Sequence, residues 1–148
     1  MKKFQFRLGS LVRLREAVRD ERRQQLAEVV QLQAALAEEM QGLRQQLDEA
    51  RHLHTAEQGT VNVDRLLNAE RYEIVLLYQK KQLEQKQATV EAEAEKRRQA
   101  LVWADQDVRV LEKLRDTQYQ QWRVAAQRFD MQQLDEIAAR QRPQEAAL

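Results

Sequence analysis

Apolar residues recur in the first half of the chain at alternating intervals of three and four positions. From Leu26 to His54 this spacing visits mostly leucine, valine, methionine and alanine, with a polar break at Gln33. Such a pattern is typical of a coiled-coil seam, in which one side of a helix faces another helix. Upstream of Leu26 the spacing departs from the heptad, so we expect the coil to unwind locally there. The residues with this altered spacing are Leu11, Leu14, Val18 and Arg22.

The second half of the chain is more regular. Stepping by three and four from Leu66 to Phe129 visits nineteen positions, and thirteen of them are apolar. A single register of this length indicates one continuous helix whose seam faces another helix. The polar exceptions have long side chains that can reach solvent from a seam. The apolar positions are Leu66, Ala69, Leu76, Leu83, Val90, Ala94, Leu101, Ala104, Val108, Leu111, Trp122, Ala125 and Phe129, and the exceptions are Glu73, Lys80, Gln87, Arg97, Arg115 and Gln118.

The segment 55–64 separates the two halves and has the composition of a turn. It contains Gly59, several β-branched residues, and the candidate N-caps Asn62 and Asp64. We therefore predict an all-α fold, a single antiparallel coiled-coil hairpin over residues 1–148. Its helices should span about 8–56 and 64–141, joined by a turn at about 57–63 and followed by a short tail at 142–148. A parallel homodimer of one unbroken helix is the alternative.

The second predicted helix is longer than the first. A turn near residue 60 pairs residue i with about 120 − i, so Leu8, at the start of helix 1, lies opposite about Glu112. The remainder, residues 113–142, forms an overhang of roughly 45 Å. Its apolar stripe has no partner inside the chain, unless Phe4, Phe6 and Leu8 fold back over its first turns. The stripe consists of Trp122, Ala125, Phe129, Met131, Leu134 and Ile137.

The charge distribution differs between the two predicted ends of the hairpin. The chain as a whole has a net charge of +1, which creates no overall attraction to nucleic acid or to anionic lipid. Residues 1–23 carry a local net charge of +5, and residues 38–70 carry −4. Acidic residues interrupt the basic start and no base-reading constellation is present, so a nucleic-acid-binding coiled coil is the less favoured interpretation.

The residues offer no chemistry for an enzyme, a metal site or a cofactor. The chain has no cysteine, and its two histidines, His52 and His54, point to nearly opposite faces of a helix. No phosphate-binding or nucleophile motif occurs, and a hairpin forms no desolvated pocket. The longest strongly apolar run, residues 74–78, is too short for a signal peptide or a membrane span. We expect a cytoplasmic, non-enzymatic protein that is a monomer when free.

The sequence contains three distinctive patches, FQFRLGSLVRLREAVRDE, GTVNVDRLLNAERYEIVL and RFDMQQLDEIAARQRP. Together they resemble the FliJ family, the soluble coiled-coil component of the bacterial flagellar type III export apparatus. The start FQFRLGSLVRLREAVRDE is similar to the family's aromatic-rich opening, and the end RFDMQQLDEIAARQRP is similar to its tail. The segment GTVNVDRLLNAERYEIVL resembles the family's stretch after the turn, where an aromatic residue is followed four positions later by an apolar one, here Tyr72 and Leu76. Gly9 and Gly42 depart from an ideal first helix, each by about 1 kcal/mol.

The resemblance implies a set of partners. Family members bind the hexameric export ATPase through their termini, contact the export-gate membrane protein, and interact with export chaperones, so the chain would sit peripherally at the inner membrane. By this resemblance, Tyr72 and Leu76 would meet the gate. Aromatic anchors and basic residues on the overhang would meet the ATPase. These residues are Trp122, Phe129, Arg115, Arg123 and Arg128. A coiled-coil adaptor or stalk of an unrelated complex is the alternative function.

Overall fold

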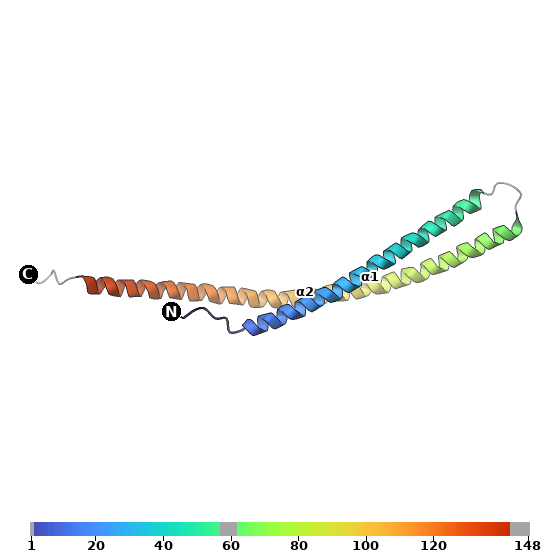
Figure 1. The fold of residues 1–148 in the computed structure, drawn as a ribbon. Coiled ribbons are helices and arrows are strands. Elements are labelled where there is room, and N and C mark those ends of the chain that lie inside the picture. Colours follow the sequence, from blue (N-terminus) through green and yellow to red (C-terminus); the bar gives the residue numbers. More distant parts are fainter. Residues whose placement is uncertain (1, 57–61, 143–148) are drawn as a thin grey trace, which may run out of the picture. The chain divides into compact units, whose positions relative to one another are not determined.

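The computed structural model describes residues 2–56 and 62–142, and Figure 1 shows its two long helices. Helix α1 spans Gly9–Ala56 and helix α2 spans Val63–Gln141. The two helices pack against each other as the antiparallel hairpin that the apolar spacing predicts, and α2 is the longer one. The predicted turn lies mostly outside the described residues.

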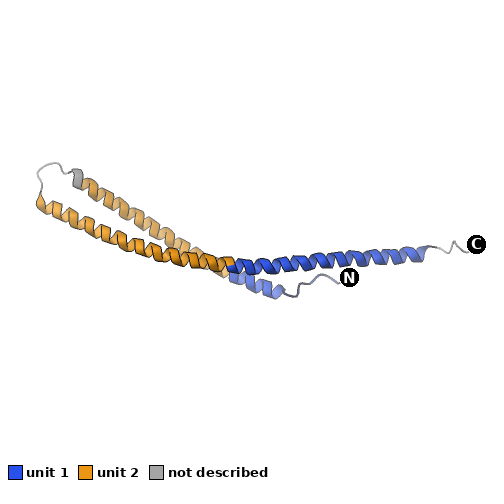
Figure 2. Ribbon diagram, turned by 180° about the vertical axis from the view of Figure 1, so that it is seen from behind, with its two compact units in different colours: residues 1–19, 103–148 blue, residues 20–102 orange. Residues whose placement is uncertain are grey.

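The chain divides into two compact units, coloured in Figure 2. Unit 1 combines residues 1–19 with residues 103–148, and unit 2 consists of residues 20–102. Each unit therefore contains a stretch of both helices, and each is described below by itself.

The start of α2 is fixed by a local cap. The side-chain Oδ1 of Asn62 accepts a hydrogen bond from the backbone N–H of Asp64 at 3.1 Å. The Asn62 carbonyl accepts the first helical bond, from the N–H of Leu66, also at 3.1 Å. Asn62 is thus the N-cap, as one of the two candidates predicted, while Asp64 lies in the first turn, where its negative charge favours the helix dipole.

Unit 2 has an apolar core between the helices. Its buried side chains lie at intervals of four, three and four residues on α1 and seven residues apart on α2, which agrees with the predicted seam. Full burial of each large aliphatic side chain contributes roughly 1.5–3 kcal/mol. Ala50 and Val90 extend the core as partly buried neighbours. The buried residues are Leu36, Met40, Leu43, Leu47, Leu76 and Leu83.

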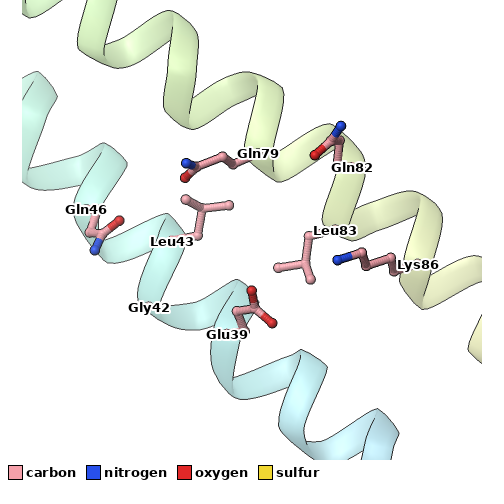
Figure 3. A pocket seen from close by; sticks show the side chains of 8 residues that line it. All are labelled: Glu39, Gly42, Leu43, Gln46, Gln79, Gln82, Leu83 and Lys86. Carbon is pink, nitrogen blue, oxygen red and sulfur yellow. The ribbon is translucent and has the colours of Figure 1, made fainter.

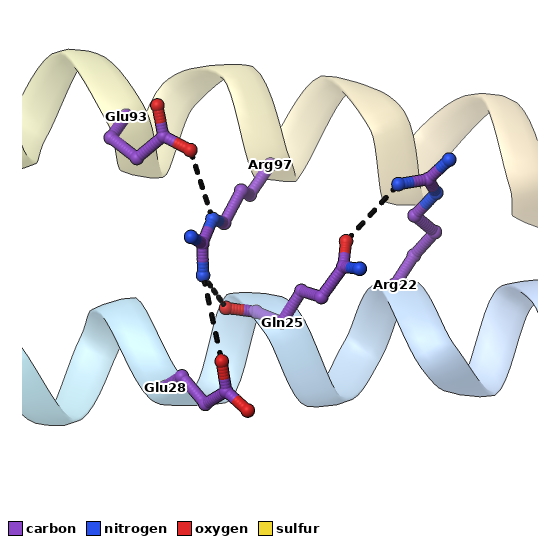
Figure 4. Close-up of polar contacts among 5 residues, drawn as sticks. All are labelled: Arg22, Gln25, Glu28, Glu93 and Arg97. Carbon is purple, nitrogen blue, oxygen red and sulfur yellow. Dashed lines mark hydrogen bonds and ion pairs between the residues drawn. The ribbon is translucent and has the colours of Figure 1, made fainter.

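A polar layer centred on Arg97 interrupts the seam of unit 2 (Figure 4). The Arg97 guanidinium reaches across from α2 and donates to the backbone carbonyl of Gln25 at 2.6 Å. It also lies 3.9 Å from Glu28 on α1 and 3.0 Å from Glu93 on its own helix. Charge-assisted bonds of this kind depend on one relative position of the two helices, so they favour the observed register.

Further cross-helix bonds in unit 2 define the pairing register. Gln33 donates to Glu91, and Arg51 donates to Glu73 at 3.1 Å. The numbers of these paired residues add up to about 124 rather than the predicted 120. The predicted pairing of residue i with about 120 − i is therefore shifted by about four residues, whereas α1 ends at Ala56 and α2 begins at Val63, on either side of the predicted turn centre near residue 60.

Unit 1 has a smaller core, made by Val12 on α1 with Ala104 and Val108 on α2. The altered spacing predicted through Leu14 does not describe the core, since Val12 is 6% exposed and Leu14 is 59% exposed. The heptad spacing continues upstream from Leu26 to Val12 in steps of four and three residues. The seam positions between these two residues hold basic side chains in place of apolar ones, so the sequence pattern does not reveal them. The basic side chains at these positions are Arg22, Arg19 and Arg15.

A shallow groove opens beside Gly42 in the middle of α1 (Figure 3). Figure 3 shows Leu43 and Leu83 pointing toward each other between the helices, with polar side chains around them. The glycine does not break the helix, and a Cβ built on it would meet nothing within 4 Å. The missing side chain is therefore not required by packing.

Replacing Leu83 with alanine should destabilise the hairpin by about 2–4 kcal/mol, because it removes a side chain from the centre of the core. Urea denaturation followed by circular dichroism measures the effect. Leu67→Ala is the matched control, since Leu67 is an exposed leucine on the same helix and should cost less than about 1 kcal/mol. Equal losses for the two variants would contradict the seam.

Gly42→Ala should raise stability by about 0.5–1 kcal/mol, since alanine has the higher helix propensity and space for its methyl group is present. The same denaturation measurement checks this. Gly9→Ala should have a smaller effect, because Gly9 is the first residue of α1, where the helix constrains the backbone least. A destabilised Gly42→Ala variant would show that the groove cannot accept a methyl group.

Candidate partner-binding surfaces

The N-terminal segment folds back onto α2 through an aromatic cluster in unit 1. The ring centroid of Phe4 lies 5.3 Å from that of Tyr119, in an edge-to-face arrangement, and 6.0 Å from that of Trp122. Tyr119 and Trp122 stack at 5.8 Å. Such aromatic pairs are each worth about 0.5–1.5 kcal/mol beyond the area they bury.

This cluster decides between the two sequence predictions for the overhang. The expectation that Trp122 has no partner inside the chain is wrong, because Phe4 covers part of it and leaves it half-buried. The alternative, in which the N-terminal aromatic segment covers the first turns of the overhang, is confirmed for Phe4. Tyr119 escaped the sequence analysis because it lies off the seam, although its spacing of three residues from Trp122 places both on one helix face.

Beyond Trp122 the apolar stripe of α2 is open to solvent. The helix continues to Gln141, and Phe129 keeps 41% of its surface exposed. Farther along, the exposed fraction of the aliphatic side chains rises to 65%. These exposed apolar side chains lie on more than one face of a helical segment that has no other described helix beside it, and they indicate a surface for a partner. The exposed residues are Val124, Phe129, Met131, Leu134 and Ile137.

Basic side chains accompany this stripe. Arg115 lies 3.7 Å from the neighbouring Asp116, a pair so exposed that it adds little stability. Arg123 and Arg128 are exposed as well, and neither forms an ion pair among the described residues. These guanidinium groups are available to steer an acidic partner.

The two predicted gate-binding residues occupy different environments in unit 2. Tyr72 has half of its surface exposed, whereas Leu76 is only 3% exposed and belongs to the core between the helices. Leu76 therefore packs in the core beneath the exposed surface around Tyr72, and its own side chain is covered by the two helices. Exposed apolar residues that the seam analysis passed over surround this part of α2, namely Leu67, Ile74, Val75 and Tyr78.

The described residues provide no metal site, since they contain no group of three or more His, Cys, Asp or Glu side chains able to hold an ion. His52 is exposed on α1, and the side chain of His54 lies outside the described part. Neither described helix has a stretch long and apolar enough to cross a membrane.

Removing the Phe4 ring should uncover Trp122. In a Trp103→Phe background, where Trp122 is the only tryptophan, Phe4→Ala should shift the fluorescence emission to longer wavelength and increase quenching by acrylamide. The reason is that the indole loses its aromatic cover and gains water contacts.

Phe6→Ala is the control, because Phe6 makes no ring contact with Trp122 in the described segments. It should change the emission much less. An unchanged spectrum for Phe4→Ala would contradict the observed packing.

A comparison with protein families gives a match over nearly the whole chain. The family described as flagellar FliJ protein matches residues 4–146, nearly the whole chain. Neither the curated proteins nor the solved structures give a match to this chain.

Proposed function

Because the chain belongs to the flagellar FliJ protein family, it is a non-enzymatic component of the flagellar export apparatus, and we propose that it binds the export ATPase and the export gate through different surfaces. One observation carries the proposal for the ATPase, namely the exposed apolar stripe of α2 beyond Trp122. Binding to export chaperones and a cytoplasmic location at the inner membrane, reached through these partners, are parts of the same proposal.

The ATPase-binding surface consists of the aromatic and basic residues of the overhang. Phe129 is the main anchor, since it is an exposed aromatic side chain on the part of α2 that extends beyond α1. Trp122 stands at the edge of this surface, where Phe4 already covers part of its ring. Arg115, Arg123 and Arg128 supply positive charge, which increases the rate of association with an acidic partner more than the affinity.

The gate-binding surface centres on Tyr72 in unit 2. The side chain combines an exposed aromatic ring with a hydroxyl group, which suits a partly polar protein interface. Leu76 contributes by packing in the core one turn farther along α2, which holds the helix in place beneath the surface. The two residues therefore have different roles in this proposal.

Phe129→Ala combined with Leu134→Ala should weaken binding to the export ATPase by about tenfold or more while leaving the melting of the hairpin nearly unchanged, since both side chains are exposed. Surface plasmon resonance with the purified ATPase measures the change, and assembly of flagella in cells gives the functional readout.

Val30→Ala with Leu32→Ala is the matched control, because these exposed aliphatic residues lie on α1 in unit 2. They should leave ATPase binding intact. An overhang variant that binds as well as the natural chain would place the ATPase contact elsewhere.

Tyr72→Ala should weaken binding to the export gate and spare the ATPase. Tyr78→Ala is its control, since Tyr78 is an exposed tyrosine on another side of the same helix. Leu76→Ala should instead lower the melting temperature, because it opens a cavity in the core. Loss of gate binding in the Tyr78 variant alone would refute the proposed position of the gate contact.

A further inference from the structure

Unit 1 carries a second apolar row on α2, separate from the seam. With Leu101 at heptad position a and Ala104 at d, Trp103 and Val110 occupy position c, and Leu114 occupies position g. Trp103 is 60% exposed and Val110 is 67% exposed. The c and g positions lie about 110° around the helix from the centre of the seam, so α1 cannot bury this row as it buries the seam.

Helix α1 contributes a matching row to the same side of unit 1. With Val12 at position a, Leu11 and Val18 occupy g positions and Leu14 occupies c. Leu11 and Val18 are half-buried, and Leu14 is exposed. In an antiparallel pair the g positions of the two helices face each other on one side and the e positions on the other. The two apolar rows therefore border one face of the helix pair.

The polar contacts support this assignment of sides. Arg15 at position d lies 3.6 Å from Asp107 at position g of the other helix, as the geometry of the g side requires. The e positions on the opposite side hold only carboxylates in this part of unit 1, at Glu16, Asp105 and Glu112. The g side of the pair is thus mainly apolar, and the other side is charged, with Arg109 lying 2.9 Å from Asp105.

We propose that the g-side face is a docking site for an amphipathic α-helix of a partner protein, with acidic residues along the borders of its apolar stripe. The face consists of two rows on adjacent helices with members three, four or seven residues apart, the spacing at which a third helix can pack its own apolar stripe against both rows. The residues that define it are Leu11, Leu14, Val18, Trp103, Val110 and Leu114.

The charges near the face select an acidic helix. Lys113 lies beside the row on α2 and Arg128 lies farther along it, and no carboxylate pairs with either among the described residues. The acid on the face, Asp107, already pairs with Arg15. The described residues of unit 1 carry a net charge of +5, so a second copy of the chain would bring like charge to the face.

Two synthetic helical peptides test the proposal with the full chain. Both carry leucines at the heptad core positions, one with flanking glutamates and the other with flanking lysines, and fluorescence anisotropy measures their binding. The glutamate peptide should bind at least about tenfold more tightly than the lysine peptide. Trp103→Gln with Val110→Gln should weaken its binding by about tenfold, and the variant should melt like the natural chain, since both residues are exposed.

Val102→Gln is the matched control, because Val102 is an exposed valine outside the g-side face, at position b. It should leave binding within about twofold. Equal affinity for the two peptides, or equal loss in the control, would overturn the proposal. Sedimentation equilibrium adds a further check, since a mass twice 17.5 kDa that falls to the monomer in Val110→Gln would assign the face to a second copy instead.

Discussion

The hairpin depends on one constraint, which is that each helix can bury its apolar stripe only against the other. A two-stranded coil has no interior beyond its seam, so the large side chains that leave solvent on folding come from heptad positions. The most buried residues illustrate how narrow this core is, since Ala94 and Val108 are almost fully enclosed while residues one position away are exposed. Isolated helices with so many polar residues are marginal in water, and the mutual burial of the stripes makes them persist.

Apolar contacts alone would allow the helices to slide by a heptad, because leucines at equivalent positions are interchangeable. Polar residues in or beside the seam oppose such a slip. Arg97 has a carbonyl and a carboxylate of α1 within reach only in the observed register, and Gln33 finds Glu91 in the same way. Outside the seam, Arg98 donates hydrogen bonds to Glu91 and to Glu95. These bonds, the one to Glu91 most, raise the pKa of the Arg98 guanidinium, which remains charged. The polar exceptions in the apolar pattern, Gln33 and Arg97, therefore determine which register the two helices adopt.

Periodicity was sufficient to predict the fold, because the same spacing that identifies a seam also determines what it must face. Periodicity was insufficient to identify the core where two different spacings fit the same stretch of α1. Val12 is buried in the core and Leu14 is exposed, because the heptad continues through seam positions that hold arginine and therefore show no apolar pattern. The cluster of Phe4, Tyr119 and Trp122 joins an irregular segment to a helix, and no periodic pattern describes such a contact. Leu76 is 3% exposed in the core between the helices, and the resemblance to a family could not reveal that burial.

The geometry of the hairpin also sets an order for its formation during synthesis. The cross-helix contacts span increasing lengths of chain, from 22 residues for Arg51 with Glu73, to 58 for Gln33 with Glu91, and 72 for Gln25 with Arg97. Closure entropy favours the shortest loop, so pairing begins beside the turn and advances toward the termini as the ribosome supplies α2. The contact of Phe4 with Trp122 closes the longest loop and forms last. Before the ribosome supplies α2, the apolar stripe of α1 has no partner in the chain, and the many charged residues of α1 keep nascent chains apart from one another.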